Sequence, residues 1–292
     1  PVAAVVATGP TTSRRAGHPM KLLTVPAGRG VLWVRSGFRV FFAKPLAYSA
    51  LFAAFLFGAL LLLLVPLLGA LLMLAALPLV SQGFMIATKG VLAGQTPLVN
   101  VFIEPIRERL PQAIMMLKLG LIYAAGSLFI MWFSDWADGG TFNALQEAMT
   151  SQTADTERLE VLLADPRLST GMLLRLFLAS CLALPFWHAP ALVHWEGQSP
   201  AQALFSSTIA CWRNKGAFAV YALTWSGVIV LFAVLINSVF LLLGAAKLVP
   251  VAAMAGGLMF STVFYASLYF TFSDCFDGQA ATEVGTDVPP AS

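Results

Sequence analysis

Charged side chains are scarce in this sequence. Only 11% of the 292 residues are Asp, Glu, Lys or Arg, whereas 59% are hydrophobic. A soluble domain is about one quarter charged, so this chain lacks the polar residues that a water-exposed surface requires. The composition therefore excludes an ordinary soluble domain and indicates a protein embedded in a bilayer. The net charge of +3 is too small to indicate a nucleic-acid partner.

Cysteines and catalytic motifs are also scarce. Cys181, Cys211 and Cys275 lie far apart and form neither CxxC nor CxxCH, so no disulfide framework, zinc site or attached haem is predicted. We interpret them as small apolar packing residues. The chain has no GxSxG, HExxH, P-loop or GxGxxG motif and no paired carboxylates within its apolar segments. The sequence thus supports no enzyme class, no cofactor and no metal.

Long apolar segments are abundant. A helix needs about 20 apolar residues to cross the hydrocarbon core, and six segments come close to that length or exceed it. They are residues 46–64, 71–88, 113–133, 171–195, 217–243 and 248–272. Short turns join the first to the second and the fifth to the sixth. The prediction is an all-α polytopic membrane protein, with a transmembrane domain over residues 20–272 whose six helices form three hairpins.

The positive charges predict the orientation. Thirteen of the 17 Lys and Arg residues precede the odd-numbered spans or lie in their first residues. Because positive charge in short loops stays inside, both termini are predicted to be cytoplasmic in a bacterial inner membrane. The long connection 134–169 carries seven acidic residues, including Asp155, and is predicted to lie outside with two short helices. It is either a solvated face or a docking surface for a partner.

The two ends of the chain are predicted to lie outside the fold. Residues 1–19 contain Arg14, Arg15 and His18 but no long apolar core, so they do not resemble a signal peptide. We treat them as an unstructured extension, and Met20 could be the natural start. Residues 273–292 are short, acidic and proline-terminated, and are predicted to be disordered.

The segment from Val31 to Phe42 has the pattern of an interfacial helix. Its apolar residues follow helical spacing, while Arg35 and Arg39 lie one turn apart on the other side. We expect Trp33 at headgroup depth and the two arginines against anionic lipid of the cytoplasmic leaflet. The alternative is a solvated helix packed on the bundle.

Three junctions suggest a weak internal repeat. They read FRVFFAKPLAYSALF, IRERLPQAIMMLKLG and ACWRNKGAFAVYALT, and each places a polar or amphipathic helix before a hairpin. Repeats of this kind can be related by an axis along the membrane normal, with a site where they meet. The alternative is that inner loops acquire basic flanks through the orientation rule alone.

The stretch PFWHAPALVHWEGQSPAQALFSSTIACWRNKGAFAVY holds the strongest candidate site. Pro185 and Pro190 lack the N–H that would pair four residues back, which frees the carbonyls of Cys181 and Phe186. His188 lies between the prolines, so His188, Cys181 and Phe186 form a candidate polar site within the bilayer. The histidine either takes part in proton transfer or ligand contact, or stays neutral and pairs with a freed carbonyl.

A second set of polar residues is predicted at the cytoplasmic helix ends. Arg213 and Asn214 precede the fifth span, and Asp274 follows the sixth on the same side. We expect an ion pair between Arg213 and Asp274 that holds these ends together.

Four segments carry a family resemblance: MKLLTVPAGRGVLWVRSGFRVFF from Met20, WHAPALVHWEG from Trp187, FSSTIACWRNKGAFAVY from Phe205 and the FSDCF ending at Phe276. Together they resemble a family of uncharacterised proteobacterial inner-membrane proteins, over most of the chain after Met20. This resemblance implies an integral helical membrane protein and no assigned activity. The helix-plus-hairpin junctions are more distantly similar to the membrane regions that accompany glycerophosphodiesterase domains, but this chain has no such catalytic domain.

Two functional hypotheses follow. The first is a non-enzymatic accessory or assembly subunit of a membrane complex, favoured by the short extramembrane segments and the acidic outer loop. The second is a small-solute transporter or channel with its site near the broken fourth span. A water-accessible cavity reaching His188 would favour the second hypothesis, and a dry, apolar interior there would remove the case for it.

Overall fold

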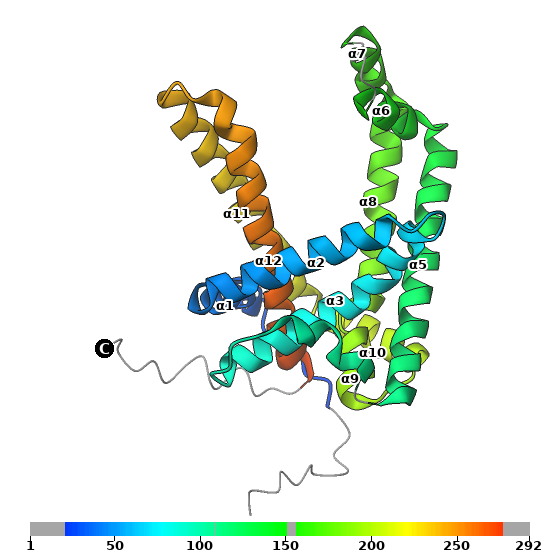
Figure 1. Cartoon of the computed structure of the whole chain (residues 1–292), viewed down its shortest axis with the longest axis vertical. Coiled ribbons are helices and arrows are strands. Elements are labelled where there is room, and N and C mark those ends of the chain that lie inside the picture. Colours follow the sequence, from blue (N-terminus) through cyan, green and yellow to red (C-terminus); the bar gives the residue numbers. More distant parts are fainter. Residues whose placement is uncertain (1–20, 108, 151–155, 277–292) are drawn as a thin grey trace, which may run out of the picture.

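The computed structural model of the chain describes residues 21–107, 109–150 and 156–276. These residues form helices joined by short turns (Figure 1). The helices are α1 (Arg29–Ala43), α2 (Pro45–Leu63), α3 (Gly69–Leu92), η1 (Val99–Phe102), α4 (Glu104–Arg107), α5 (Leu110–Asp138), α6 (Thr141–Thr150), α7 (Thr156–Ala164), α8 (Pro166–Phe186), α9 (Ala189–Glu196), α10 (Pro200–Arg213), α11 (Lys215–Leu242), η2 (Ala246–Leu248) and α12 (Val249–Phe276).

Six helical segments are long and apolar enough to cross a membrane, which confirms the predicted all-α polytopic fold. They are α2, α3, α5, α8 with α9, α11, and η2 with α12. Capping residues set several of the boundaries. The Asp165 side chain accepts a hydrogen bond from the N–H of Arg167 at the start of α8, and Gly139 ends α5 with a φ of 65°.

Several helices extend beyond the predicted spans, and α5 and α12 are two of them. α5 continues to Asp138, beyond the predicted end of the third span at Phe133. α12 continues to Phe276, so Ser273 to Phe276 are buried helical residues and not part of a tail. The remaining tail, 277–292, and the predicted extension, 1–19, lie outside the described residues.

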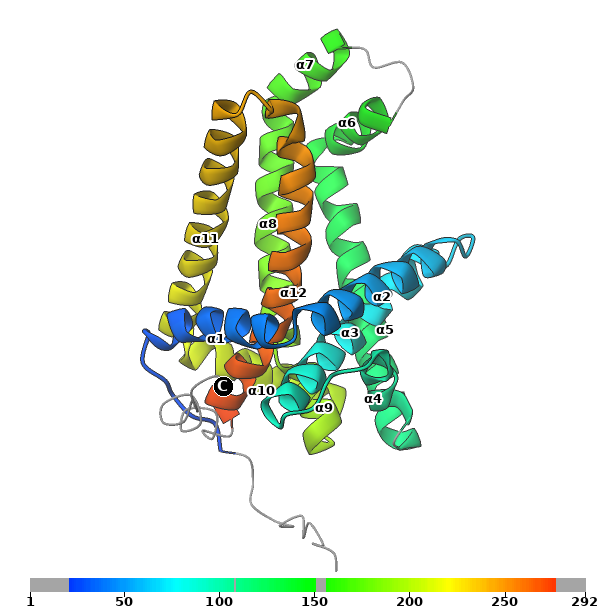
Figure 2. The same cartoon turned by 60° about the vertical axis from the view of Figure 1, so that its left-hand side comes forward.

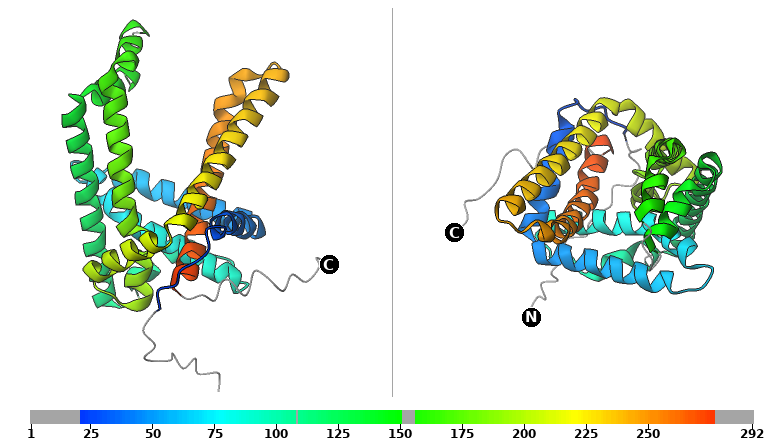
Figure 3. Two further views of the ribbon diagram at one scale, coloured as in Figure 1. Left: turned by 180° about the vertical axis from the view of Figure 1, so that it is seen from behind. Right: turned by 90° about the horizontal axis from the view of Figure 1, so that it is seen from above.

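The hairpins do not share one orientation. α5–α8 and α11–α12 stand upright and diverge from a common base, whereas α2–α3 lies across them (Figures 2 and 3). α1, α4, α9 and α10 gather at this base, which we call the basic end because most described arginines and lysines lie there. α6 and α7 cover the opposite end of α5–α8. These are the two short helices predicted for the acidic connection, whose residue Asp155 lies outside the described residues.

An arginine in α8 holds together the end of α5–α8 that lies opposite the basic end, which we call the acidic end. The Arg175 Nη2 atom lies 2.6 Å from Asp135 Oδ1 of α5, and its guanidinium lies 4.0 Å from the ring centre of Phe142 in α6. Gly171 permits α8 to approach α5 closely, because a Cβ atom there would meet the buried side chain of Asp138. These contacts fix the α5–α8 hairpin at its far end.

Helix α1 packs on the bundle instead of lying free in the interface. Gly30 and Gly37 allow this, since a Cβ atom at Gly30 would clash with the α11 backbone and one at Gly37 with Ser267 and Val263 of α12. Trp33 is consequently 1% exposed, so its side chain faces the protein and not the lipid, while its depth in the membrane stays a prediction. Arg35 and Arg39 do lie on the exposed side of the helix, as predicted.

The buried partner of Asp274 is Arg29, not Arg213. Arg29 Nε and Nη2 each lie 2.7 Å from a carboxylate oxygen of Asp274, and Trp33 Nε1 donates to the same carboxylate at 2.6 Å. Arg213 is exposed at the end of α10. The close packing of α1 on α12 places Arg29 against this carboxylate in the position predicted for Arg213.

Asn214 belongs to the same base through a different contact. Its Oδ1 accepts the N–H of Val25 at 2.8 Å, and its Nδ2 donates to the carbonyl of Leu23 at 3.0 Å. The N–H of Leu23 donates to the carbonyl of Cys275 at 2.8 Å. The segment before α1 is thereby held between the α10–α11 junction and the end of α12.

Replacement of Arg29 tests this base. Arg29→Gln leaves the carboxylate of Asp274, 1% exposed, without its counter-charge. Removing one member of a buried ion pair costs about 3 kcal/mol or more, so we expect a clearly lowered midpoint of thermal unfolding in detergent. Arg35→Gln, on the exposed side of the same helix, is the control and should change the midpoint little. Equal midpoints for both variants would contradict this account of the base.

Candidate functional site

The fourth span is broken between α8 and α9. α8 ends at Phe186, and α9 begins at Ala189 with Pro190 in its first turn. Trp187 and His188 occupy the break. The proline pair therefore interrupts the helix as its sequence predicts, because Pro190 cannot donate the next helical hydrogen bond.

Ser207 of α10 bridges the break. Its hydroxyl donates to the carbonyl of Leu184 at 2.9 Å and accepts the N–H of His188 at 3.0 Å. The Cys211 thiol lies one turn further along α10 and donates to the same carbonyl at 3.6 Å. Burial raises the pKa of the Cys211 thiol to about 12, which keeps it protonated as a donor. The sequence predicted freed carbonyls at Cys181 and Phe186, whereas the carbonyl that receives these donors is that of Leu184.

His188 is fully buried in an aromatic shell. Its ring lies 5.4 to 6.0 Å from those of Phe218, Phe272 and Phe276, centre to centre. Its Nε2 lies 3.2 Å from the hydroxyl of Thr271, which also accepts the indole N–H of Trp187 at 3.1 Å. The histidine thus connects the break to α12 through the hydroxyl of Thr271.

The predicted polar site of His188, Cys181 and Phe186 does not assemble. Cys181 is exposed on α8, His188 is enclosed, and Phe186 packs in the apolar core. The break turns the chain between positions 181 and 188, so their spacing of seven no longer places them on one face. Among the described residues, no three His, Cys, Asp or Glu side chains are grouped to hold a metal ion.

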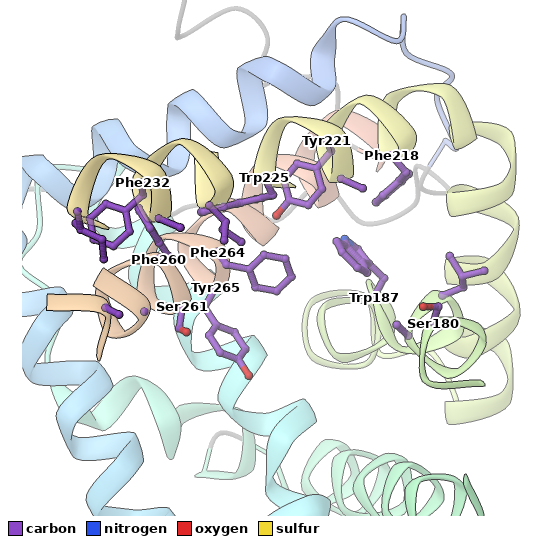
Figure 4. Close-up of a pocket in the computed structure, with 18 residues that line it drawn as sticks. Ser180, Trp187, Phe218, Tyr221, Trp225, Phe232, Phe260, Ser261, Phe264 and Tyr265 are labelled. Atoms are coloured by element: carbon purple, nitrogen blue, oxygen red, sulfur yellow. The ribbon is translucent and has the colours of Figure 1, made fainter. Parts of the chain in front are cut away.

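Above the break lies a cavity of about 800 Å³ between α8 and the α11–α12 hairpin, which we call the cleft. Figure 4 shows the aromatic side chains of α11 and α12 facing Trp187 and Ser180 across it. Its lining residues are Ser180, Ala183, Leu184, Trp187, Phe218, Tyr221, Ala222, Trp225, Ile229, Phe232, Ala233, Ile236, Ala253, Gly257, Phe260, Ser261, Phe264 and Tyr265. No charged side chain is among them.

One wall of the cleft is made of small side chains. Ala253, Gly257 and Ser261 follow each other at intervals of four along α12, and all three line the cleft. A Cβ atom added at Gly257 would meet nothing within 4 Å, so the backbone of α12 is accessible there. Small residues at this spacing allow two membrane helices to approach closely.

A second cavity continues inward from the cleft. It measures about 180 Å³ and shares Ala183, Trp187, Phe264 and Tyr265 with the cleft. Residues of α3 and α5 also line it, together with Phe186 and Leu268, so it reaches the meeting point of the three hairpins. His188 lines neither cavity.

Sequence reasoning missed Ser207, Thr271 and Gly257. The spacing of small residues along α12 could have indicated the cleft wall. Nothing in the local sequence distinguishes Ser207 from its neighbour Ser206, because its role depends on where α10 packs.

Ser207→Ala tests the bridge over the break. The substitution leaves the N–H of His188 and the carbonyl of Leu184 with fewer partners in a buried region, where a lost hydrogen bond costs about 1–3 kcal/mol. We expect a lower unfolding midpoint and faster proteolysis near the break. Ser206→Ala, at the adjacent and partly exposed position, is the control. If the two variants unfold alike, Ser207 does not hold the break.

The comparisons with known proteins concern the whole chain. No family model and no solved structure matches it. It is similar to a probable inner membrane protein of Burkholderia thailandensis, with 32% identity over 261 residues that cover 89% of this chain and 95% of the relative. The likeness to membrane regions of glycerophosphodiesterases stays a prediction. The chain is a multi-pass inner membrane protein, and it belongs to the same protein family as this Burkholderia protein.

Proposed function

We propose that this protein is a non-enzymatic accessory or assembly subunit that receives a transmembrane helix of another membrane protein in the cleft. The observation that carries the proposal is the length of the cleft. Its lining residues on α11 extend from Phe218 to Ile236. At about 1.5 Å per residue, these 18 steps cover about 27 Å, which is close to the whole hydrocarbon thickness of about 30 Å. A lipid chain belongs to one leaflet and would fill about half of this length.

The surface of the cleft also suits a helix. The small side chains of Ala253, Gly257 and Ser261 expose the α12 backbone, and such positions are enriched where membrane helices meet. The neighbouring helix of the same hairpin, α11, offers Trp225 and Phe232, large rings that can pack around an inserted helix.

Helix α11 itself lacks protein neighbours over most of its length. Within its most apolar stretch of 18 residues, only 6% of the residues are buried inside the described part of the chain. The other upright spans are buried to a larger extent, up to 39% for the span formed by α8 and α9. A helix with so little buried surface is expected of a subunit that is completed by a partner.

The transporter hypothesis receives less support from the site. A small polar solute needs polar groups along its path, and the cleft has no charged side chain. His188 lies behind Phe218 and Thr271 and outside both cavities. The enclosure of His188 outside both cavities therefore weakens the transporter hypothesis relative to the accessory subunit.

Lipid contacts form the second part of the proposal. Arg35 and Arg39 lie on the exposed side of α1, near the exposed apolar side chains of Leu32 and Phe42. A basic face next to apolar residues fits the headgroup region of anionic lipids. This contact would hold the basic end at the predicted cytoplasmic surface.

Site-specific crosslinking tests the occupant of the cleft. A photoreactive p-benzoylphenylalanine at Ile229, which lines the cleft, should form a discrete adduct with another polypeptide in membranes. The same group at Val230, which is exposed but does not line the cleft, should not form this adduct. Adducts of Ile229 with phospholipid alone would contradict the proposal.

A pair of glycine variants provides the matched control. Gly257→Trp fills the cleft, whereas Gly227→Trp places the same bulk on another exposed face of the hairpin, and neither glycine has an atom within 4 Å of an added Cβ. We expect Gly257→Trp to abolish the Ile229 adduct and Gly227→Trp to retain it, with equal unfolding midpoints. An adduct that survives Gly257→Trp would show that the partner binds elsewhere.

A further inference from the structure

The turn between α2 and α3 differs in composition from the turns at the far ends of the other hairpins. It reads LLLLVPLLGALL over residues 61–72 and contains no polar side chain. By contrast, Lys247 lies in the connection between α11 and α12, and α5 ends at Asp138 and is followed by Thr141. A turn that emerges from the bilayer requires polar groups for the headgroup region, and the first hairpin has none at its tip.

The hairpin is also placed where it does not reach the far surface. α1 and α2 run almost in one line along the basic end, and the tip of the hairpin reaches only the middle height of the upright helices (Figures 1 and 2). α2 has 19 residues and is about 28 Å long, so it spans about 30 Å of hydrocarbon only when it stands upright.

The start of α2 and the end of α3, which lie opposite the tip of the hairpin, are held at the base. The Tyr48 hydroxyl lies 3.0 Å from that of Thr88, near the start of α2 and the end of α3 respectively. Thr88 also lies 3.2 Å from the carbonyl of Ala266 in α12. These bonds hold both ends of the hairpin on the same side and leave the tip pointing outward into the surrounding space.

Most backbone N–H groups of the tip are paired. Within the turn, the N–H groups of Leu64, Val65, Leu68 and Gly69 donate to turn or helix carbonyls at 2.7–3.3 Å, Pro66 has no N–H, and the N–H of Leu67 has no backbone partner among the described residues. Gly69 lets the two helices touch, because a Cβ atom there would lie 2.6 Å from the carbonyl of Leu62. Meanwhile Leu64, Leu67 and Leu68 expose 52% to 103% of their side chains. Backbone groups that pair within the turn and apolar side chains that face outward are what a lipid environment favours.

We infer that α2–α3 is a re-entrant hairpin, which enters the membrane from the basic end and keeps its tip, Leu64 to Leu68, within the hydrocarbon of the bilayer. Its partner is the lipid interior, and the hairpin widens the base of the protein within the leaflet next to the basic end. The orientation of the remaining spans is unchanged, since a re-entrant hairpin and a spanning hairpin both return to the side of entry.

Cysteine accessibility tests the inference in intact membranes. The probe is a membrane-impermeant maleimide, applied to vesicles sealed in either orientation. Single cysteines are placed at Leu67 and, as control, at Lys247 in the turn between α11 and α12, with Cys181 replaced by Ala. Cys211 and Cys275 are buried and can be retained or replaced. Lys247→Cys should react in one vesicle orientation, and Leu67→Cys should react at least tenfold more slowly in both.

A charge at the tip gives an independent readout. Leu67→Lys should lower the yield of folded, inserted protein severalfold, because a lysine in hydrocarbon is strongly disfavoured. Ala246→Lys, in the exposed turn between α11 and α12, should leave the yield unchanged. Labelling of Leu67→Cys at the rate of Lys247→Cys, or full tolerance of Leu67→Lys, would show that the tip reaches water and would overturn the inference.

Discussion

The structure depends on one buried carboxylate at the basic end. Asp274, at the last turn of α12, binds Arg29 through both carboxylate oxygens and also accepts the indole N–H of Trp33. A carboxylate with 1% exposure is stable only when it is paired, so α1 must lie against α12 for the fold to form. The neighbouring Asn214 then holds the segment before α1 to the start of α11. The ends of three helices are thereby fixed within a small region.

The rest of the molecule follows from this concentration of polar contacts. The break in the fourth span is closed at the same end by Ser207 and Thr271. Toward the acidic end, the two upright hairpins have few polar contacts with each other, and they diverge (Figure 3). Apolar side chains gain little by leaving lipid for protein, so nothing draws these far halves together. The cleft is therefore a consequence of strong pairing at the base and weak attraction above it.

The sequence predicted the helices better than it predicted their contacts. Segments such as 46–64 need only length and apolarity to be recognised, and the prolines at 185 and 190 mark the break directly. The base could not be predicted in this way, because Arg29 and Arg213 are equivalent in local pattern. Only the close packing permitted by Gly30 and Gly37 decides between them. Trp33 illustrates the same limit, since an indole in a basic amphipathic segment is typical of an interface, yet here it is buried against Asp274.

The separation of the two upright hairpins is the most direct test of the cleft. Spin labels at Leu173 on α8 and Leu231 on α11, both exposed, report this separation by pulsed electron spin resonance in lipid nanodiscs. The account predicts that the two labels lie well beyond the roughly 8–10 Å between the axes of packed helices. In nanodiscs without a partner protein, this distance should shorten only a little. A short distance typical of two helices in contact would mean that the hairpins close on each other, and it would contradict the cleft.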